Sequence, residues 1–206
     1  MGCGRTDTGV HARQFYAHFE SDIEIVRTDV IHSLNSMLPE DIVLTEILIP
    51  KETDAHARYD AVSRKYIYKI MREPDPFQSG LAWHYSGNLD LQNIQNACDL
   101  LLQTEDFEAL SKINKDLKHY KCELNEAQWI EDGNILELHI SANRFVRSMI
   151  RIIVGTMILI GKNKLSVSQL KEALEKRDRS MVGKAAPPQG LYLHSVVYPK
   201  NYFVNE

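Results

Sequence analysis

The sequence has little that would support covalent or metal cross-linking. Its 206 residues include three cysteines, Cys3, Cys98 and Cys122, and no Cys-x-x-Cys pair. An odd number of cysteines without that spacing argues against a disulfide scaffold and against a standard zinc site. We therefore expect no metal, a reducing cytoplasmic compartment, and packing roles for the three thiols.

Long hydrophobic runs are also missing. The longest, residues 152–160, reaches nine residues only if Gly155 and Thr156 are counted, whereas a membrane helix needs about twenty. No positively charged segment followed by an apolar one precedes the first motif, so the sequence gives no support for secretion. The expectation is a cytoplasmic protein with no membrane partner.

What is present is typical of a folded domain. Hydrophobic residues make up 44% of the chain and charged residues 25%, values that argue against disorder, collagen and coiled coils. The length suits one medium domain or two small ones.

Positive charge is concentrated in two segments of an otherwise acidic chain. The net charge is −4, yet residues 55–72 carry +4 and residues 141–164 carry +5. Such clusters can neutralise phosphates and release counterions. Solvated surface charge is the alternative interpretation, and the distribution alone does not decide between the two.

The order of expected elements indicates the fold class. Apolar alternation and turn residues predict strands at 13–20, 42–49, 61–71, 122–131, 134–141 and 190–198. Helical spacing predicts helices at 28–37, 90–103, 145–160 and 166–177, with Asp90 and Ser166 as caps. Irregular alternation with hairpins is typical of an α+β fold, not of a doubly wound parallel sheet. We place the domain boundary near residue 54, giving units 1–54 and 55–206.

The segment 2–12, Gly-Cys-Gly-Arg-Thr-Asp-Thr-Gly-Val-His-Ala, is the most informative in the chain. Its glycines permit left-handed backbone and close approach by another chain segment. Arg5 and Asp7 would then project from one loop. The ending Gly-Lys-Ser/Thr of a P-loop is absent, and a plain turn with a solvated Asp7 remains an alternative.

Two other patterns stand out. Arg144, Arg147 and Arg151 are spaced i, i+3, i+7, which would put them on one face of the expected apolar helix. Spacing alone favours a surface role for Arg151 over a buried pairing with a carboxylate. Tyr66 and Tyr68 share one face of the expected 61–71 strand, where core packing is the ordinary role.

A resemblance covers nearly the whole chain. The signature Gly-Arg-Thr-Asp-Thr-Gly-Val-His-Ala at 4–12 is similar to that of the TruA family of tRNA pseudouridine synthases. Further matches follow in order: Asn-Ser-Met-Leu-Pro-Glu-Asp-Ile at 35–42, His-Ala-Arg-Tyr at 56–59, Arg-Lys-Tyr-Ile-Tyr at 64–68, Asp-Phe at 106–107, Phe-Val-Arg-Ser-Met-Ile-Arg-Ile-Ile-Val-Gly at 145–155 and Gly-Leu-Tyr-Leu at 190–193.

The resemblance implies roles for four residues. Asp7 aligns with the catalytic aspartate, which attacks the target uridine at C1′ of the ribose or at C6 of the base, without a cofactor. Arg5 aligns with an arginine that enters the RNA stem as the nucleotide flips out. Tyr66 aligns with a tyrosine that stacks on uracil, and Arg151 with an arginine that pairs with the catalytic carboxylate.

The resemblance also implies a partner and a fold. The substrate would be tRNA at positions 38 to 40 of the anticodon stem-loop, and the enzyme a homodimer. Two ferredoxin-like, split βαββαβ halves would flank a central cleft. The further residues expected to bind RNA are Arg58, Lys65, Lys69, Arg144 and Arg147.

The sequence differs from the family pattern at its N-terminal end. The family's earlier Tyr-Asp-Gly-Thr and Gly-Trp-Gln segments do not occur in this sequence, so the N-terminal half is expected to be truncated. A non-catalytic, tRNA-binding or dimerising remnant of the same family is the alternative function.

Overall fold

The computed structural model describes residues 1–22, 27–114 and 117–204. Its strands are β1 (His11–Ala12), β2 (Ser63–Met71), β3 (Trp83–His84), β4 (Leu124–Asp132), β5 (Ile135–Ala142) and β6 (Leu191–Val197). Its α-helices are α1 (Arg27–Asn35), α2 (Leu91–Leu102), α3 (Met149–Gly161) and α4 (Val167–Lys176). Short 3₁₀ turns form η1 (Pro76–Gln78), η2 (Glu108–Leu110), η3 (Arg179–Met181) and η4 (Pro188–Gly190).

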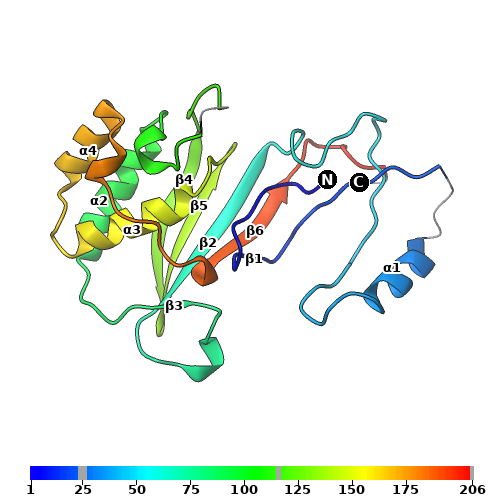
Figure 1. Cartoon of the computed structure of the whole chain (residues 1–206), viewed down its shortest axis with the longest axis horizontal. Coiled ribbons are helices and arrows are strands. Elements are labelled where there is room, and N and C mark those ends of the chain that lie inside the picture. The colour runs from blue at the N-terminus through cyan, green and yellow to red at the C-terminus, as the bar shows by residue number, and fades with distance from the viewer. Residues whose placement is uncertain (23–26, 115–116, 205–206) are drawn as a thin grey trace.

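One mixed sheet organises the chain. Its strand order is β1-β6-β2-β5-β4, with β3 pairing with β2. From β2 onward the order along the chain is β2, α2, β4, β5, α3, α4, β6, and β6, β2, β5 and β4 are antiparallel neighbours. This is the split βαββαβ arrangement, so the expected α+β class is confirmed. Helices α2, α3 and α4 cover one face of this sheet (Figure 1).

Local sequence explains the helices of that layer. The Asp90 side chain accepts a hydrogen bond from the backbone N–H of Asn93, which caps α2. Ser166 and Gln169 form a reciprocal capping box at the start of α4. Helix α3 is apolar on nearly all sides, packs against α2, and has most of its residues buried in the core. None of the helices in the described ranges is long and apolar enough to cross a bilayer.

Two of the expected strands do not form. Residues 13–20 form no strand and pair with the start of the chain through an isolated antiparallel bridge, Gly2 to Ala17. Residues 42–49 form no strand, and Ile42 and Val43 are exposed. The prediction was wrong there because β-branched residues favour a strand only where a neighbouring strand and a buried face exist. In Figure 1 this segment and α1 lie away from the sheet.

The start of α3 also differs from the expectation. The helix begins at Met149, after Ser148 adopts a left-handed conformation with φ 60°. Arg144 lies in a loop and Arg147 in a turn, both before the helix. The single helix face predicted for Arg144, Arg147 and Arg151 is therefore wrong, because the left-handed residue interrupts the helical spacing.

Candidate active site

An ion pair joins the glycine-rich loop to helix α3. The Nη1 atom of Arg151 donates to Oδ2 of Asp7 at 2.6 Å, and the Ser148 hydroxyl lies 3.4 Å from the same oxygen. The Asp7 side chain is 33% exposed and that of Arg151 is 18% exposed. Within the described part of the chain both contacts fall on Oδ2, so Oδ1 is the oxygen left for a ligand.

Backbone contacts fix the loop that carries Asp7. The Val10 N–H donates to the Asp7 carbonyl at 3.2 Å, and Gly9 turns the chain at φ +82°. His11 and Ala12, which follow Val10, form β1, and β1 pairs in parallel with β6. A residue with a side chain would be strained at that φ, so the sequence places Asp7 beside α3 through a glycine turn anchored to the sheet.

Asp7 and Arg151 line a cavity of about 620 Å³. Its wall includes Lys112, Arg147 and Arg179. Four cationic residues and one carboxylate thus line the cavity, and Ser111, Ile113, Ser148, Ile152 and Ala185 complete the lining. The excess of positive charge favours an anionic ligand such as an RNA phosphate.

Lys112 and Arg179 were missed by the sequence analysis. Lys112 follows η2, and its N–H donates to the Arg147 carbonyl at 3.0 Å. Arg179 opens η3, after α4. They come from separate connections without a local motif, so only the tertiary structure brings them to Asp7.

Tyr66 and Arg5 lie outside the lining of this cavity. Tyr66 is 9% exposed as a residue, and its ring packs edge-on against Phe145 with the ring centroids 5.2 Å apart. Burial raises the pKa of Tyr66 to about 12, so its hydroxyl stays protonated at neutral pH. Arg5 is exposed on the loop and makes no ion pair with another described residue.

The basic side chains of residues 55–72 do not form one cluster with Asp7. Lys65 pairs with Glu126 at 2.9 Å and Lys69 with Glu137 at 3.2 Å. Side chains alternate along β2, so both lysines project from the sheet face opposite to Tyr68 and the helices. The structure does not bring them to Asp7.

Two arginines of that segment serve different contacts. Arg64 donates hydrogen bonds to the backbone carbonyls of Cys3, Arg58, Ala61 and Asn143, and so ties the glycine-rich loop to the sheet. The Arg58 guanidinium lies over the Tyr59 ring at 5.7 Å.

Arg144, from the second basic segment, is half-buried beside Cys122, whose pKa is raised to about 11, chiefly by burial.

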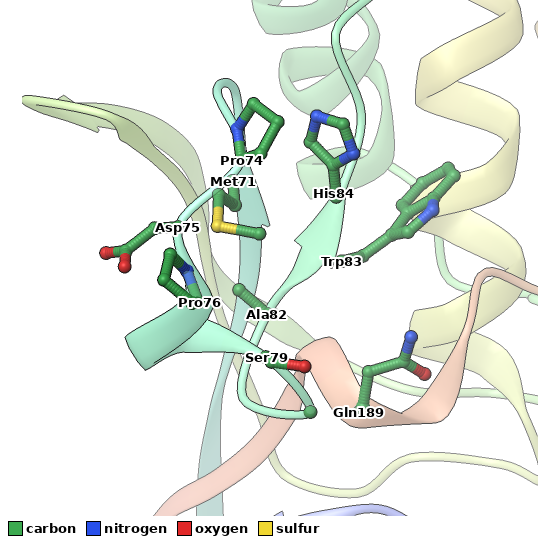
Figure 2. A pocket seen from close by; sticks show the side chains of 10 residues that line it. Met71, Pro74, Asp75, Pro76, Ser79, Ala82, Trp83, His84 and Gln189 are labelled. Carbon is green, nitrogen blue, oxygen red and sulfur yellow. The ribbon is translucent and has the colours of Figure 1, made fainter.

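A second hollow, of about 590 Å³, lies beside β3 and η1. Figure 2 shows Trp83, His84 and Asp75 around it, with Gln189 entering from η4. Its lining contains one carboxylate and no lysine or arginine. The cationic cavity is therefore the better candidate for a polyanion.

A paired carboxylate in a cationic cavity defines a class of site suited to nucleophilic chemistry on an anionic substrate. Comparison with known proteins makes the assignment specific. Residues 97–199 match a family model described as tRNA pseudouridine synthase. Proteins named tRNA pseudouridine synthase A are similar over nearly the whole chain. The one from Porphyromonas gingivalis is 39% identical over 99% of this chain and 82% of its own length.

Two further relatives agree. The protein of that name from Parabacteroides distasonis is 37% identical, covering 98% of this chain and 81% of its own. The one from Bacillus subtilis is 34% identical, covering 96% and 81%. The chain belongs to the tRNA pseudouridine synthase family. This membership makes it an enzyme of the isomerase class.

Proposed function

We propose that this protein converts uridine to pseudouridine in the anticodon stem-loop of tRNA, at positions 38 to 40. The observation that carries the proposal is the Asp7–Arg151 ion pair at the wall of a cationic cavity. The tRNA substrate is supported by the names of the relatives, and the stem-loop by the resemblance of the motifs.

The reaction needs one nucleophile and no co-reactant. Oδ1 of Asp7 attacks the uridine, at C1′ of the ribose or at C6 of the base, while Arg151 holds Oδ2. The bond between N1 and C1′ breaks, the uracil turns, and a bond forms between C5 and C1′. C5 loses its proton, N1 takes up a proton from water, and release of the carboxylate completes an isomerisation in which atoms and electrons balance.

Other residues would bind and expose the target nucleotide. Arg5, exposed on the Asp7 loop, fills the space that the flipped base leaves. Tyr66 stacks on the uracil, which requires RNA binding to uncover the ring of a residue that is now 9% exposed. Lys112, Arg147 and Arg179 contact the flanking phosphates. Arg58, Arg144, Lys65 and Lys69 stay predicted RNA contacts.

Three further expectations stay predictions: a homodimer, a cytoplasmic location, and a division into units 1–54 and 55–206. Only β1 and α1 are regular elements in the described part of the first unit. Because β1 joins the sheet of the second unit, the two units would share one sheet.

Release of tritium from tRNA labelled at C5 of uridine tests the activity directly. The C5 hydrogen leaves only when pseudouridine forms, so turnover releases label into water. We expect release from the wild-type chain with tRNA that carries uridine at positions 38 to 40, and none when these uridines are replaced by cytidine. Binding of tRNA without release would instead support the non-catalytic remnant.

Salt dependence tests the cavity as the phosphate-binding surface. Lys112→Gln and Arg179→Gln should each reduce the slope of log Kd against log salt by about 1 at most, because each removes one phosphate contact. Lys65→Gln should change the slope less, since Glu126 already neutralises that lysine. Filter binding at several salt concentrations measures all three. Equal slopes for Lys112→Gln, Arg179→Gln and wild type would contradict the assignment of the cavity.

A further inference from the structure

One segment contacts Arg151, the Asp7 loop and strand β2 of the sheet. Residues 183–190, here called the strap, run from the end of η3 to the start of β6. Ala185 lines the Asp7 cavity and Gln189 lines the second hollow (Figure 2). The strap therefore contributes one residue to the lining of each hollow.

The strap holds Arg151 at two points. The Nε atom of Arg151 donates to the Ala186 carbonyl at 2.7 Å, and the Ala186 N–H donates to the Arg151 carbonyl at 2.8 Å. With Nε fixed on the strap, the planar guanidinium can aim Nη1 at Asp7 in one orientation. The position of Ala186 thus sets the direction of the ion pair.

The strap also supports the other partner of the pair. Pro188 lies against Gly9 of the Asp7 loop, where a Cβ on Gly9 would come within 3.2 Å of the proline ring. Asp7 is two residues from this contact. A shift of the strap would therefore move the carboxylate loop and the guanidinium together.

Beneath the strap stands a buried tyrosine. The Tyr68 hydroxyl donates to the Pro187 carbonyl at 2.7 Å, between the Ala186 and Pro188 contacts, and the Tyr68 side chain is fully buried in the core. A Cβ on Gly190 would come within 2.8 Å of the Tyr68 ring. The ring and the hydroxyl of Tyr68 together fix the distance between residues 187–190 and β2.

We propose that Tyr68 is a positioning residue for the Asp7–Arg151 pair and acts through the strap. Core packing explains its ring, but Phe would supply that packing equally. The hydroxyl instead joins the middle of the strap to β2, one residue from the carbonyl that orients Arg151. The inference rests on the proposed function only for its effect on turnover.

Tyr68→Phe and Tyr198→Phe form a matched comparison. The Tyr198 hydroxyl also donates to a backbone carbonyl, that of Ala57 at 2.6 Å, and its ring packs against Tyr16, Tyr202 and Phe203, none of which belongs to the strap. The coupling of Asp7 and Arg151 is measured by denaturant melting, as a double-mutant cycle of Asp7→Asn and Arg151→Met in each background. We expect Tyr68→Phe to reduce the coupling by about half or more, and Tyr198→Phe to leave it unchanged.

Turnover gives a second readout. Misplacement of reacting groups lowers the rate of chemistry more than binding, so Tyr68→Phe should lower kcat about tenfold with KM unchanged, whereas Tyr198→Phe should lower neither. An Asp7–Arg151 coupling that is the same in the Tyr68→Phe background as in the wild type would overturn the positioning role, even in a chain without turnover. Absence of turnover in the wild type would contradict the proposed function alone, because the coupling is measured on unfolding.

Discussion

Asp7→Asn is expected to abolish pseudouridine formation while tRNA binding persists. The amide keeps the shape of the side chain but is not a nucleophile, and the cationic residues of the cavity remain. Removal of a catalytic nucleophile lowers rates by about 10⁴-fold or more in enzymes that form covalent intermediates. Tritium release measures the rate, and filter binding measures the affinity for tRNA.

Asp99→Asn is the control for this substitution. Asp99 is exposed on α2, and its carboxylate accepts a hydrogen bond only from Gln95 among the described residues. We expect this variant to retain wild-type turnover. Substantial tritium release from folded Asp7→Asn would exclude Asp7 as the nucleophile and would direct attention to another group of the cavity.

The parts of the fold that the sequence predicted well are those defined by local chemistry. Helices α2 and α4 were predicted from a capping residue followed by apolar helical spacing, and the Asp90 and Ser166 caps are present. Asp132-Gly133, between the strands expected at 122–131 and 134–141, is typical of a hairpin turn, and Gly133 has φ +57° in the turn that joins β4 and β5. These signals lie within a few residues of the structure that they specify.

The failures depend on distant partners or on a single backbone angle. Residues 42–49 have strand composition, but a strand also needs a neighbour to pair with, which composition cannot reveal. The arginine spacing assumed a helix through residue 145, whereas Ser148 turns left-handed without a side-chain cap. A serine between Arg147 and Met149 gives no warning of that turn.

The candidate site divides in the same way. The resemblance implied the Asp7–Arg151 pairing, whereas spacing alone favoured a surface role for Arg151. The concentration of charge in residues 55–72 suggested a basic surface, but Glu126 and Glu137 from neighbouring strands neutralise Lys65 and Lys69. No local sequence pattern marks Lys112 and Arg179 as site residues. They line the same cavity as Asp7 because η2, η3 and α3 pack together, which local sequence does not reveal.

Arg151→Met is expected to lower both the free energy of unfolding and turnover. The substitution keeps a long apolar side chain in α3 but removes the hydrogen bonds to Asp7 and to the Ala186 carbonyl. An exposed ion pair contributes up to about 1 kcal/mol, and breaking a buried pair costs about 3–5 kcal/mol. Side chains that are 18% and 33% exposed lie between these limits, so we expect a coupling of about 1–3 kcal/mol.

A cycle with Asp7→Asn separates the pair from the rest of the site. The double variant should recover part of the stability that Arg151→Met loses, because the Asp7 carboxylate is no longer left without its partner, yet it should form no pseudouridine. Lys171 and Glu175, exposed on α4 at 3.9 Å, provide a surface pair whose coupling should be only about 0.3–0.5 kcal/mol. If the Asp7–Arg151 coupling is no larger than this reference, Arg151 acts as a phosphate contact and the carboxylate is oriented by Ser148 and the glycine turn alone.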